Sequence, residues 1–589
     1  MFISRAFQVR LFFCPKFVKP KSFATKDALP FREVLLLLTG TTIAVIAVLF
    51  IFKILFPMRK SLLIFLAYLF LIPVVAFPQQ TNRSDPKETS QKIAATLFFI
   101  ENFYLDTVNT PRLTEQAIIG MLKELDPHSS YLSKKEVDAA NEPLEGSFEG
   151  IGVTFQLFND TILIVSPVPG GPSDKLGIQA GDKIIRINGE DAFGSKVNNN
   201  FVMERLRGKR GTTVNVSILR QGRKDLIEYT ITRDKIPINS IDATFMLSDK
   251  TGFIKLNRFS KTTMEEFSAS MQQLRKQGME NLILDLRNNS GGFLNTAVEL
   301  SDEFLPAGSL VVYTEGRNSP RQDFFATARG DFEKGRLVVL INEASASASE
   351  IVSGAVQDSD RGLVIGRRSF GKGLVQRPFQ LPDGSVIRLT TARYHTPTGR
   401  SIQRPYEDGN ESYFRDMQDR VRRGEHMHAD SIHFPDSLKY FTPNGRIVYG
   451  GGGIMPDIFI PFDSTQYTDY YSNLIRRGVF NRFTLEYANR ERNRLKKTYP
   501  RFEQFKTGFE VSDAMMNDFL AMARNEKVEW NEEQYKLSQS LIREQIKALI
   551  ARNIWDMSAY WEITSQTDET VQKALEILRS ENFFSLLKK

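Results

Sequence analysis

A chain of 589 residues is long enough for about three or four domains. Apolar residues make up 41% and charged residues 25%, as in globular proteins, and the net charge of +8 is spread along the chain without the dense Lys/Arg block typical of nucleic-acid binding. The only cysteine, Cys14, lies near the start, which excludes disulfides, cysteine-based zinc sites and thiol catalysis from the rest of the chain.

Two apolar segments precede the main body. Residues 34–56 are long enough to span a bilayer, whereas residues 61–77 form a shorter run. Residues 58–76 have the basic start, apolar centre and final small residue of a signal peptide cleaved after Ala76. We expect residues 1–57 to be an upstream extension of the reading frame, with a membrane anchor at 34–56 as the alternative. In both cases we expect the body to be exported to the bacterial periplasm or cell envelope, either free or anchored in the inner membrane.

Residues 83–145 form a helical region. Apolar residues recur at helical spacing in IAATLFFIENFYL and LTEQAIIGMLKEL, and LDPHSSYL ends this run with a turn. The turn contains His128, which we interpret as a capping or packing residue.

Residues 146–234 form a separate module. EGIGVTF predicts a glycine turn that leads into a strand, and ILIVSPVPGGPSDKLGIQAGDKIIRINGED predicts strand, turn, short helix, turn and strand. This order resembles a PDZ domain. The resemblance implies that the backbone amides of Gly150, Ile151 and Gly152 bind a peptide's terminal carboxylate, and that the peptide adds as a strand to the sheet. A purely scaffolding role for the module is the alternative.

Residues 238–463 are expected to form an α/β core. TGFIKLNRF predicts a strand, TMEEFSASMQQLRKQG an amphipathic helix, and NLILDLRNNSGGFLNTAVEL a buried strand, a glycine turn and a helix. This repeated strand–helix order is typical of an α/β fold. Gly291 and Gly292 in the turn allow the backbone to approach a ligand closely.

The chemistry of the core is concentrated in residues 337–376. Leu337–Ile341 predicts a buried strand and residues 350–357 a helix, with Ser345, Ser347 and Ser349 between them. A serine on such a strand-to-helix turn can project its hydroxyl into a cleft. The N–H groups that open the helix can then stabilise an oxyanion.

A second candidate group follows in the turn FGKG. Lys372 lies between two glycines, and a partly desolvated lysine can lose its proton near neutral pH and act as a base. Gln376 is four residues further on. In an extended strand it shares a face with Lys372 and could orient it. Taken alone, the glycines could also mark an ordinary tight turn.

Together, SASASEI, the following QD and FGKGLVQ closely resemble the C-terminal processing peptidases, also called tail-specific proteases. The resemblance covers roughly residues 95–463. It implies that Ser347 is the nucleophile, that Lys372 is the general base and that Gln376 assists the lysine.

The same resemblance assigns further parts of the chain. It implies a crotonase/ClpP-like α/β core, with residues 83–145 as the helical segment that precedes it. Asp358 takes a structural or supporting position. The resemblance also implies that the amide of Ala348 forms the oxyanion hole with an amide of Gly291 or Gly292, and the sequence does not distinguish these two glycines.

Beyond Gln376, a hairpin is predicted around Pro382-Asp383-Gly384 and a polar surface insertion at residues 407–440. His395 could in principle form a triad with Ser347, but Lys372 at the family's spacing argues against it. The remaining histidines of this stretch lack the spacing of a metal site, and we interpret them as surface residues: His426, His428 and His433.

Residues 464–589 contain long amphipathic runs and predict a helical region whose aromatic residues form a core or a dimer interface. Overall, the sequence predicts a multidomain α/β serine endopeptidase that binds free, apolar C-termini of proteins or peptides and requires no cofactor, metal or nucleic acid. Membrane association through the N-terminal segment and homo-oligomer formation are open. The alternatives are a catalytically silent PDZ scaffold and a crotonase-like acyl-CoA enzyme.

Overall fold

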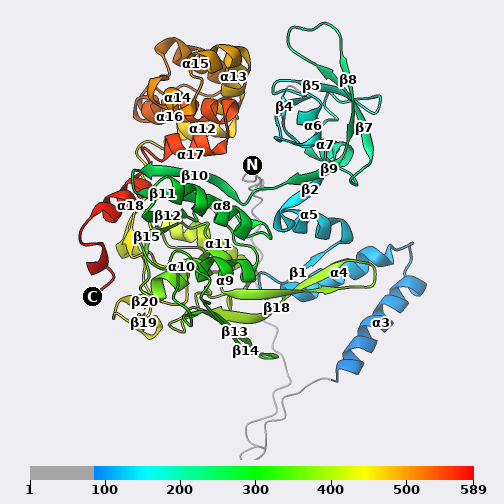
Figure 1. Ribbon diagram of the computed structural model, residues 1–589. Coiled ribbons are helices and arrows are strands. Elements are labelled where there is room, and N and C mark those ends of the chain that lie inside the picture. The colour runs from blue at the N-terminus through cyan, green and yellow to red at the C-terminus, as the bar shows by residue number, and fades with distance from the viewer. Residues whose placement is uncertain (1–84, 159, 589) are drawn as a thin grey trace, which may run out of the picture. The chain divides into compact units, whose positions relative to one another are not determined.

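The computed structural model describes residues 85–158 and 160–588 (Figure 1). The chain divides into two compact units, Met1–Thr110 and Pro111–Lys589. In the first unit the described part contains helix α3 (Pro86–Phe103), which begins after Asp85, whose carboxylate accepts the N–H of Lys87. Within the described residues no helix has the length and apolar character needed to cross a bilayer. Cys14 and the two apolar segments lie outside the described residues.

The second unit begins with two helices and a short strand. These are α4 (Thr110–Lys123), β1 (Ser130–Leu132) and α5 (Lys134–Glu145). The turn between α4 and β1 is the predicted LDPHSSYL turn, so the helical region expected from the sequence is confirmed, with one strand added to it.

The predicted PDZ module follows as a six-stranded antiparallel sheet with two helices. Its strands run in the order β3-β4-β5-β7-β8, and β6 pairs with β5. Isoleucine and valine side chains from these strands form a core of their own, so the domain has the packing of an independent module. The elements are β2 (Ser147–Gly150), β3 (Val153–Phe158), β4 (Thr161–Pro167), α6 (Pro172–Lys175), β5 (Lys183–Ile187), β6 (Glu190–Asp191), α7 (Asn199–Leu206), β7 (Thr213–Leu219), β8 (Ile227–Thr232) and β9 (Asp234–Pro237), which pairs with β2.

A second six-stranded sheet forms the centre of the α/β core, with the order β10-β11-β12-β15-β16-β21. Apart from β10, which is antiparallel to β11, neighbouring strands run parallel. The core is therefore built from β–α–β units, as the sequence predicts. Its elements are β10 (Ile241–Ser248), β11 (Thr251–Leu256), α8 (Thr263–Lys276), β12 (Asn281–Asp285), α9 (Leu294–Asp302), β15 (Leu337–Ile341), α10 (Ala348–Asp358), β16 (Leu363–Gly366) and β21 (Ile458–Phe459).

Both faces of this central sheet are covered. In β15, Val339 packs in the cluster that contains residues of α8, α9 and α10, whereas Val338 and Leu340 pack against helix α18 (Glu569–Arg579). Figure 1 shows α18 in red beside the sheet. Burial on both faces explains why these strands are continuous apolar runs.

A third sheet lies beside the core, with the order β1-β18-β13-β14 and with β17 paired to β18. β17 and β18 form the hairpin predicted around Pro382-Asp383-Gly384. Besides β1, the strands of this sheet are β13 (Leu310–Gly316), β14 (Ser319–Phe325), β17 (Leu374–Gln380) and β18 (Val386–His395). They are followed in the chain by helix α11 (Gly409–Arg422) and by β19 (Lys439–Phe441) and β20 (Ile447–Tyr449), which form a separate two-stranded sheet.

The C-terminal region is helical, as predicted. Its aromatic residues pack against one another inside the region: the rings of Phe480 and Phe519 lie 5.0 Å apart and those of Phe505 and Phe509 4.4 Å apart. The helices are α12 (Asp469–Arg476), α13 (Val479–Thr498), α14 (Phe502–Gly508), α15 (Asp513–Asn525), α16 (Glu532–Ile554), α17 (Met557–Thr564) and α18.

Candidate active site

The candidate residues lie on three loops that follow neighbouring parallel strands. The 286–292 loop follows β12, the 342–347 turn follows β15 and the 367–373 turn follows β16. Because the carboxyl ends of parallel strands meet at one edge of the sheet, the loops converge there. The strand order β12-β15-β16 thus brings the predicted nucleophile and base together.

The three serines of SASAS differ in their surroundings. Ser345 and Ser349 are fully buried, and their hydroxyls donate to the carbonyls of Leu286 and Asn289, each at 2.9 Å. Ser347 is only partly buried, and unlike the other two serines its hydroxyl donates to no carbonyl among the described residues. Its φ of 54° is also rare for a residue other than glycine. Of the three hydroxyls, that of Ser347 alone is free to react.

Glu350, in the first turn of α10, joins the serine turn to the lysine turn. One carboxylate oxygen accepts the N–H groups of Ser347 at 2.8 Å and Lys372 at 2.9 Å. The other accepts the N–H of Gly371 at 2.7 Å and the hydroxyl of Ser369 at 2.5 Å. Burial raises the pKa of the Glu350 carboxyl, and these four donors oppose that effect. Glu350 was not among the site residues predicted from the sequence.

Tyr394 of β18 joins the same two turns on their carbonyl side. Its hydroxyl lies 2.5 Å from the carbonyl oxygen of Lys372 and 3.1 Å from that of Ser347. Burial raises the pKa of Tyr394 well above its usual value, so the phenol remains a neutral donor. The backbones of Ser347 and Lys372 are therefore held together at two points.

The Lys372 side chain has the environment of a base. Burial lowers the pKa of its amine, and the nearby Glu350 carboxylate partly opposes this shift. The carboxylates of Glu350 and Asp126 act on the amine through their charge, without a hydrogen bond to it among the described residues. A lysine in this setting reaches its neutral form more readily than one in water.

The two glycines of the 286–292 loop can now be distinguished. A side chain on Gly291 would begin 2.8 Å from the Cβ of Ser347 and 3.0 Å from the amide nitrogen of Ala348, so the loop backbone lies directly against the serine. The N–H of Gly291 is occupied, because it donates to Asn289 Oδ1 at 2.9 Å. The amides of Gly292 and Ala348 have no acceptor among the described residues.

Comparison with known proteins shows the family and the domains of the chain. Residues 250–408 match peptidase family S41, residues 150–231 a PDZ domain and residues 74–136 the activating protease CtpB N-terminal domain. A carboxy-terminal-processing protease of Bartonella bacilliformis is 34% identical over 59% of this chain and 81% of its own length. The carboxy-terminal processing protease CtpB of Bacillus subtilis is 30% identical over 70% of this chain and 83% of its own. The chain belongs to the carboxy-terminal processing proteases of peptidase family S41.

Two further comparisons concern solved structures and the C-terminal region. The photosystem II D1 C-terminal processing protease is 30% identical, with 53% of this chain and 83% of that chain covered and a TM-score of 0.32. A PDZ domain of a carboxy-terminal protease from Vibrio cholerae, solved in complex with a peptide, is 34% identical over 15% of this chain and 97% of its own, with a TM-score of 0.14. Residues 470–556 match a family of unknown function, DUF8443.

In this S41 protease, neither Gln376 nor Asp358 forms a hydrogen bond with Ser347 or Lys372 among the described residues. The Gln376 amide donates to Thr390 Oγ1 at 3.5 Å, and no hydrogen bond joins it to Lys372 within the described part of the chain. Lys372 precedes β17, so the strand spacing assumed in the sequence analysis does not apply to it. Asp358 is buried at the end of α10 and binds Arg400 at 2.6 Å, which places it in the support of the fold.

The LDPHSSYL turn and helix α11 pack beside the site. His128 contacts the Tyr413 hydroxyl at 2.8 Å, and burial lowers the pKa of its ring to about 4, so it is a neutral packing residue. Tyr413 and Arg420 of α11 are both buried, and Arg420 donates to the carbonyl of Ser369 at 2.8 Å. In α11 the predicted surface insertion at 407–440 buries only these two residues, which its many charged residues concealed in the sequence.

His395 does not provide an alternative base for Ser347. His395 stacks on Tyr313 at 4.7 Å and contacts the carbonyl of Gly399, which gives no support to a triad with Ser347. In the part of the chain that the structure describes, no group of three or more His, Cys, Asp or Glu residues could hold a metal ion.

The predicted peptide-binding turn of the PDZ domain lies between β2 and β3. The carbonyl of Ile151 accepts the hydroxyl of Ser173 at 2.7 Å, and Gly152 has a φ of 73°. The amides of Ile151 and Gly152 have no acceptor among the described residues. Strand β3 is the edge of its sheet, so its outer side is available to an added strand.

Proposed function

We propose that Ser347 and Lys372 are the nucleophile and general base of this carboxy-terminal processing protease. Neutral Lys372 takes the proton of the Ser347 hydroxyl as its oxygen attacks the scissile carbonyl. The lysine then gives that proton to the leaving amine, and water hydrolyses the resulting acyl-enzyme. The observation that carries this proposal is the Glu350 carboxylate, which binds the backbone N–H of both residues with one oxygen.

The proposed oxyanion hole consists of the amides of Ala348 and Gly292. Both amides are free of protein acceptors within the described residues, and Ala348 opens helix α10, whose dipole favours negative charge there. Gly291 is needed for a different reason, since its missing side chain leaves room for Ser347.

The PDZ domain is proposed to capture the substrate by its C-terminus. The free amides of Ile151 and Gly152 suit a terminal carboxylate, and the edge strand β3 suits the residues that precede it. The substrates are therefore proteins or peptides with free, apolar C-termini, cleaved upstream of the captured end.

We also propose that the protein is exported to the periplasm or cell envelope. The basic start and apolar run of residues 58–76 support this. N-terminal sequencing of the protein from its native envelope should give Phe77 as the first residue, whereas a peptide from residues 1–57 would contradict the internal start.

Mass spectrometry of an unfolded protein, incubated with wild type and with Ser347→Ala, tests the proposed chemistry. Wild type should produce defined fragments and Ser347→Ala none, at unchanged melting temperature. Ser353→Ala, which removes another hydroxyl of α10 away from the site, is the matched control and should cleave normally. If Ser347→Ala remained active while Ser345→Ala or Ser349→Ala were inactive, the assignment of the nucleophile would be wrong.

A further inference from the structure

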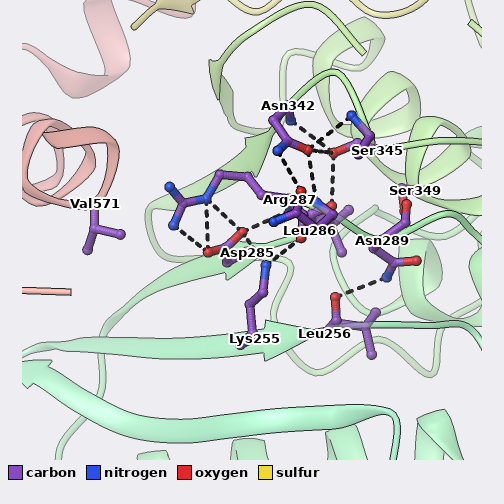
Figure 2. A network of polar contacts seen from close by, with 12 residues as sticks. Lys255, Leu256, Asp285, Leu286, Arg287, Asn289, Asn342, Ser345, Ser349 and Val571 are labelled. Carbon is purple, nitrogen blue, oxygen red and sulfur yellow. Dashed lines mark hydrogen bonds and ion pairs between the residues drawn. The ribbon is translucent and has the colours of Figure 1, made fainter. Parts of the chain in front are cut away.

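The 286–292 loop is held by a buried charge cluster as well as by its own backbone contacts (Figure 2). Arg287 donates to both oxygens of Asp285, through Nε at 3.0 Å and Nη2 at 2.7 Å, and Lys255 donates to Asp285 at 3.0 Å. Figure 2 shows both cations directed at this carboxylate. Lys255 also donates to the carbonyl of Arg287 at 2.5 Å, so the cluster holds both the side chain and the backbone of that residue.

The fourth member of the cluster comes from the far end of the chain. Asp568 precedes helix α18 and accepts both bonds of Arg287 Nη1, at 2.8 and 3.0 Å. Among the described residues Nη1 has no other partner. Removal of Asp568 would therefore leave Arg287 with Asp285 as its only carboxylate partner among the described residues, and Asp285 also binds Lys255.

The position of Arg287 affects the position of the proposed oxyanion donor Gly292 through the rest of the loop. Two residues later, the Asn289 carbonyl accepts the N–H of Ala346 at 3.0 Å, and the Asn289 side chain accepts the N–H of Gly291. A displacement of Arg287 is therefore transmitted along a short segment to Gly291 and Gly292, which lie against Ser347.

Docking of α18 does not depend on this ion pair. The helix is held on the central sheet by a buried apolar cluster to which it contributes Val571, Ala574, Ile577 and Leu578. Asp568 also accepts the N–H of Val571 at 3.0 Å as a helix cap, and an asparagine can do the same. The negative charge of Asp568 is therefore needed for Arg287 and not for the attachment of the helix.

We propose that Asp568 is a positioning residue of the peptidase, which acts through Arg287 on the oxyanion hole. The C-terminal helical region then contributes to the rate of the reaction, although none of its residues contacts the reacting atoms. This inference rests on the proposed roles of Ser347, Ala348 and Gly292.

The test compares Asp568→Asn with Glu569→Gln in the full-length protein. Both variants remove one negative charge from the start of α18, but Glu569 is exposed and lies outside the charge cluster. On a tail-bearing peptide, Asp568→Asn should lower kcat about tenfold and leave KM unchanged, because a small displacement of oxyanion donors weakens only the transition state. Glu569→Gln should match wild type, and Asp568→Glu should recover part of the loss.

A second readout reports on the oxyanion hole itself. A peptide boronic acid forms a tetrahedral adduct with a nucleophilic serine, so its affinity should fall in Asp568→Asn in proportion to kcat. Binding of the same tail to the PDZ domain should not change.

Equal kcat values for Asp568→Asn and Glu569→Gln would overturn the proposal. So would a loss of kcat in Asp568→Asn that follows only the fraction of unfolded protein, measured from its melting curve. Failure of the proposed function is distinguishable, because wild type itself would then not react with the boronic acid at Ser347.

Discussion

Two turns of this protein carry backbone amides that have no acceptor among the described residues, and they are built differently. In the 286–292 loop, side chains from β11, β12 and the 342–347 turn bind the backbone, and Arg287 is bound in addition by Asp568 of the C-terminal region. In the turn of residues 150–152, the backbone is bound by Ser173 and by main-chain bonds alone.

The difference corresponds to the tasks proposed for the two turns. An oxyanion hole accelerates a reaction only if its donors are fixed where charge develops, so small displacements are costly. A peptide that adds to an edge strand gains affinity from many main-chain bonds and can adapt to its partner. We therefore expect substitutions that disturb the catalytic loops to lower kcat by up to orders of magnitude. Changes that weaken binding at the turn of residues 150–152 should raise KM only moderately.

The largest effect should come from Lys372. Lys372→Ala should lower kcat by about 10³-fold or more, because the variant lacks the amine that is proposed to accept the serine proton. Lys372→Arg should be equally inactive, since a guanidinium does not lose its proton in proteins. Turnover of a chromogenic peptide measures the effect, with melting curves as the control for folding. An active Lys372→Arg variant would contradict a role as base.

Glu350→Gln should have the next largest effect. An amide offers one acceptor oxygen to the four donors that the carboxylate binds, so the serine and lysine turns should move apart. We expect kcat to fall about 10²-fold and the free energy of unfolding to fall by about 1–3 kcal/mol for each buried donor left without a partner. Glu343→Gln, which removes a carboxylate paired with Arg367, is the control and should lose far less activity.

The pH dependence of cleavage should differ from that of peptide binding at the PDZ turn, which distinguishes the two sites without any mutation. Burial lowers the pKa of Lys372, and only the neutral amine accepts a proton, so kcat/KM should rise with pH through that lowered pKa and level off above it. Below the pKa, each pH unit should reduce the rate about tenfold. Binding of a tail peptide to the PDZ turn, which uses backbone amides, should stay constant over the same range. A rate that fell with rising pH would exclude the lysine as base.

The local structure around the site could be predicted from the sequence. The strand Leu337–Ile341, the helix that follows SASAS and the β17–β18 hairpin all have strong local patterns, because burial on both faces and tight turns restrict the residue types. The motifs also identified Ser347 and Lys372 as candidates, and the structure brings them together.

The residues that hold the site together could not be predicted in this way. Glu350 has the pattern of an ordinary helix residue, and its four bonds depend on how β15 and β16 pair. Asp568 is 281 residues from Arg287 in the chain, so no local pattern connects them. Sequence periodicity describes which face of an element is buried, whereas these contacts depend on which elements become neighbours.

The smallest effect should come from the substrate's own C-terminus. Replacing a free carboxylate with an amide removes the charge that the amides of Ile151 and Gly152 are proposed to bind, and KM should rise about tenfold. The value of kcat should not change, because the scissile bond still meets the same Ser347 and Lys372. Two peptides that differ only in amidation measure this directly, and a short peptide without a tail should be cleaved with a KM as high as that of the amidated one. Equal KM values for the free and amidated tails would mean that the PDZ domain is a spacer, and a change in kcat would mean that tail capture alters the catalytic loops themselves.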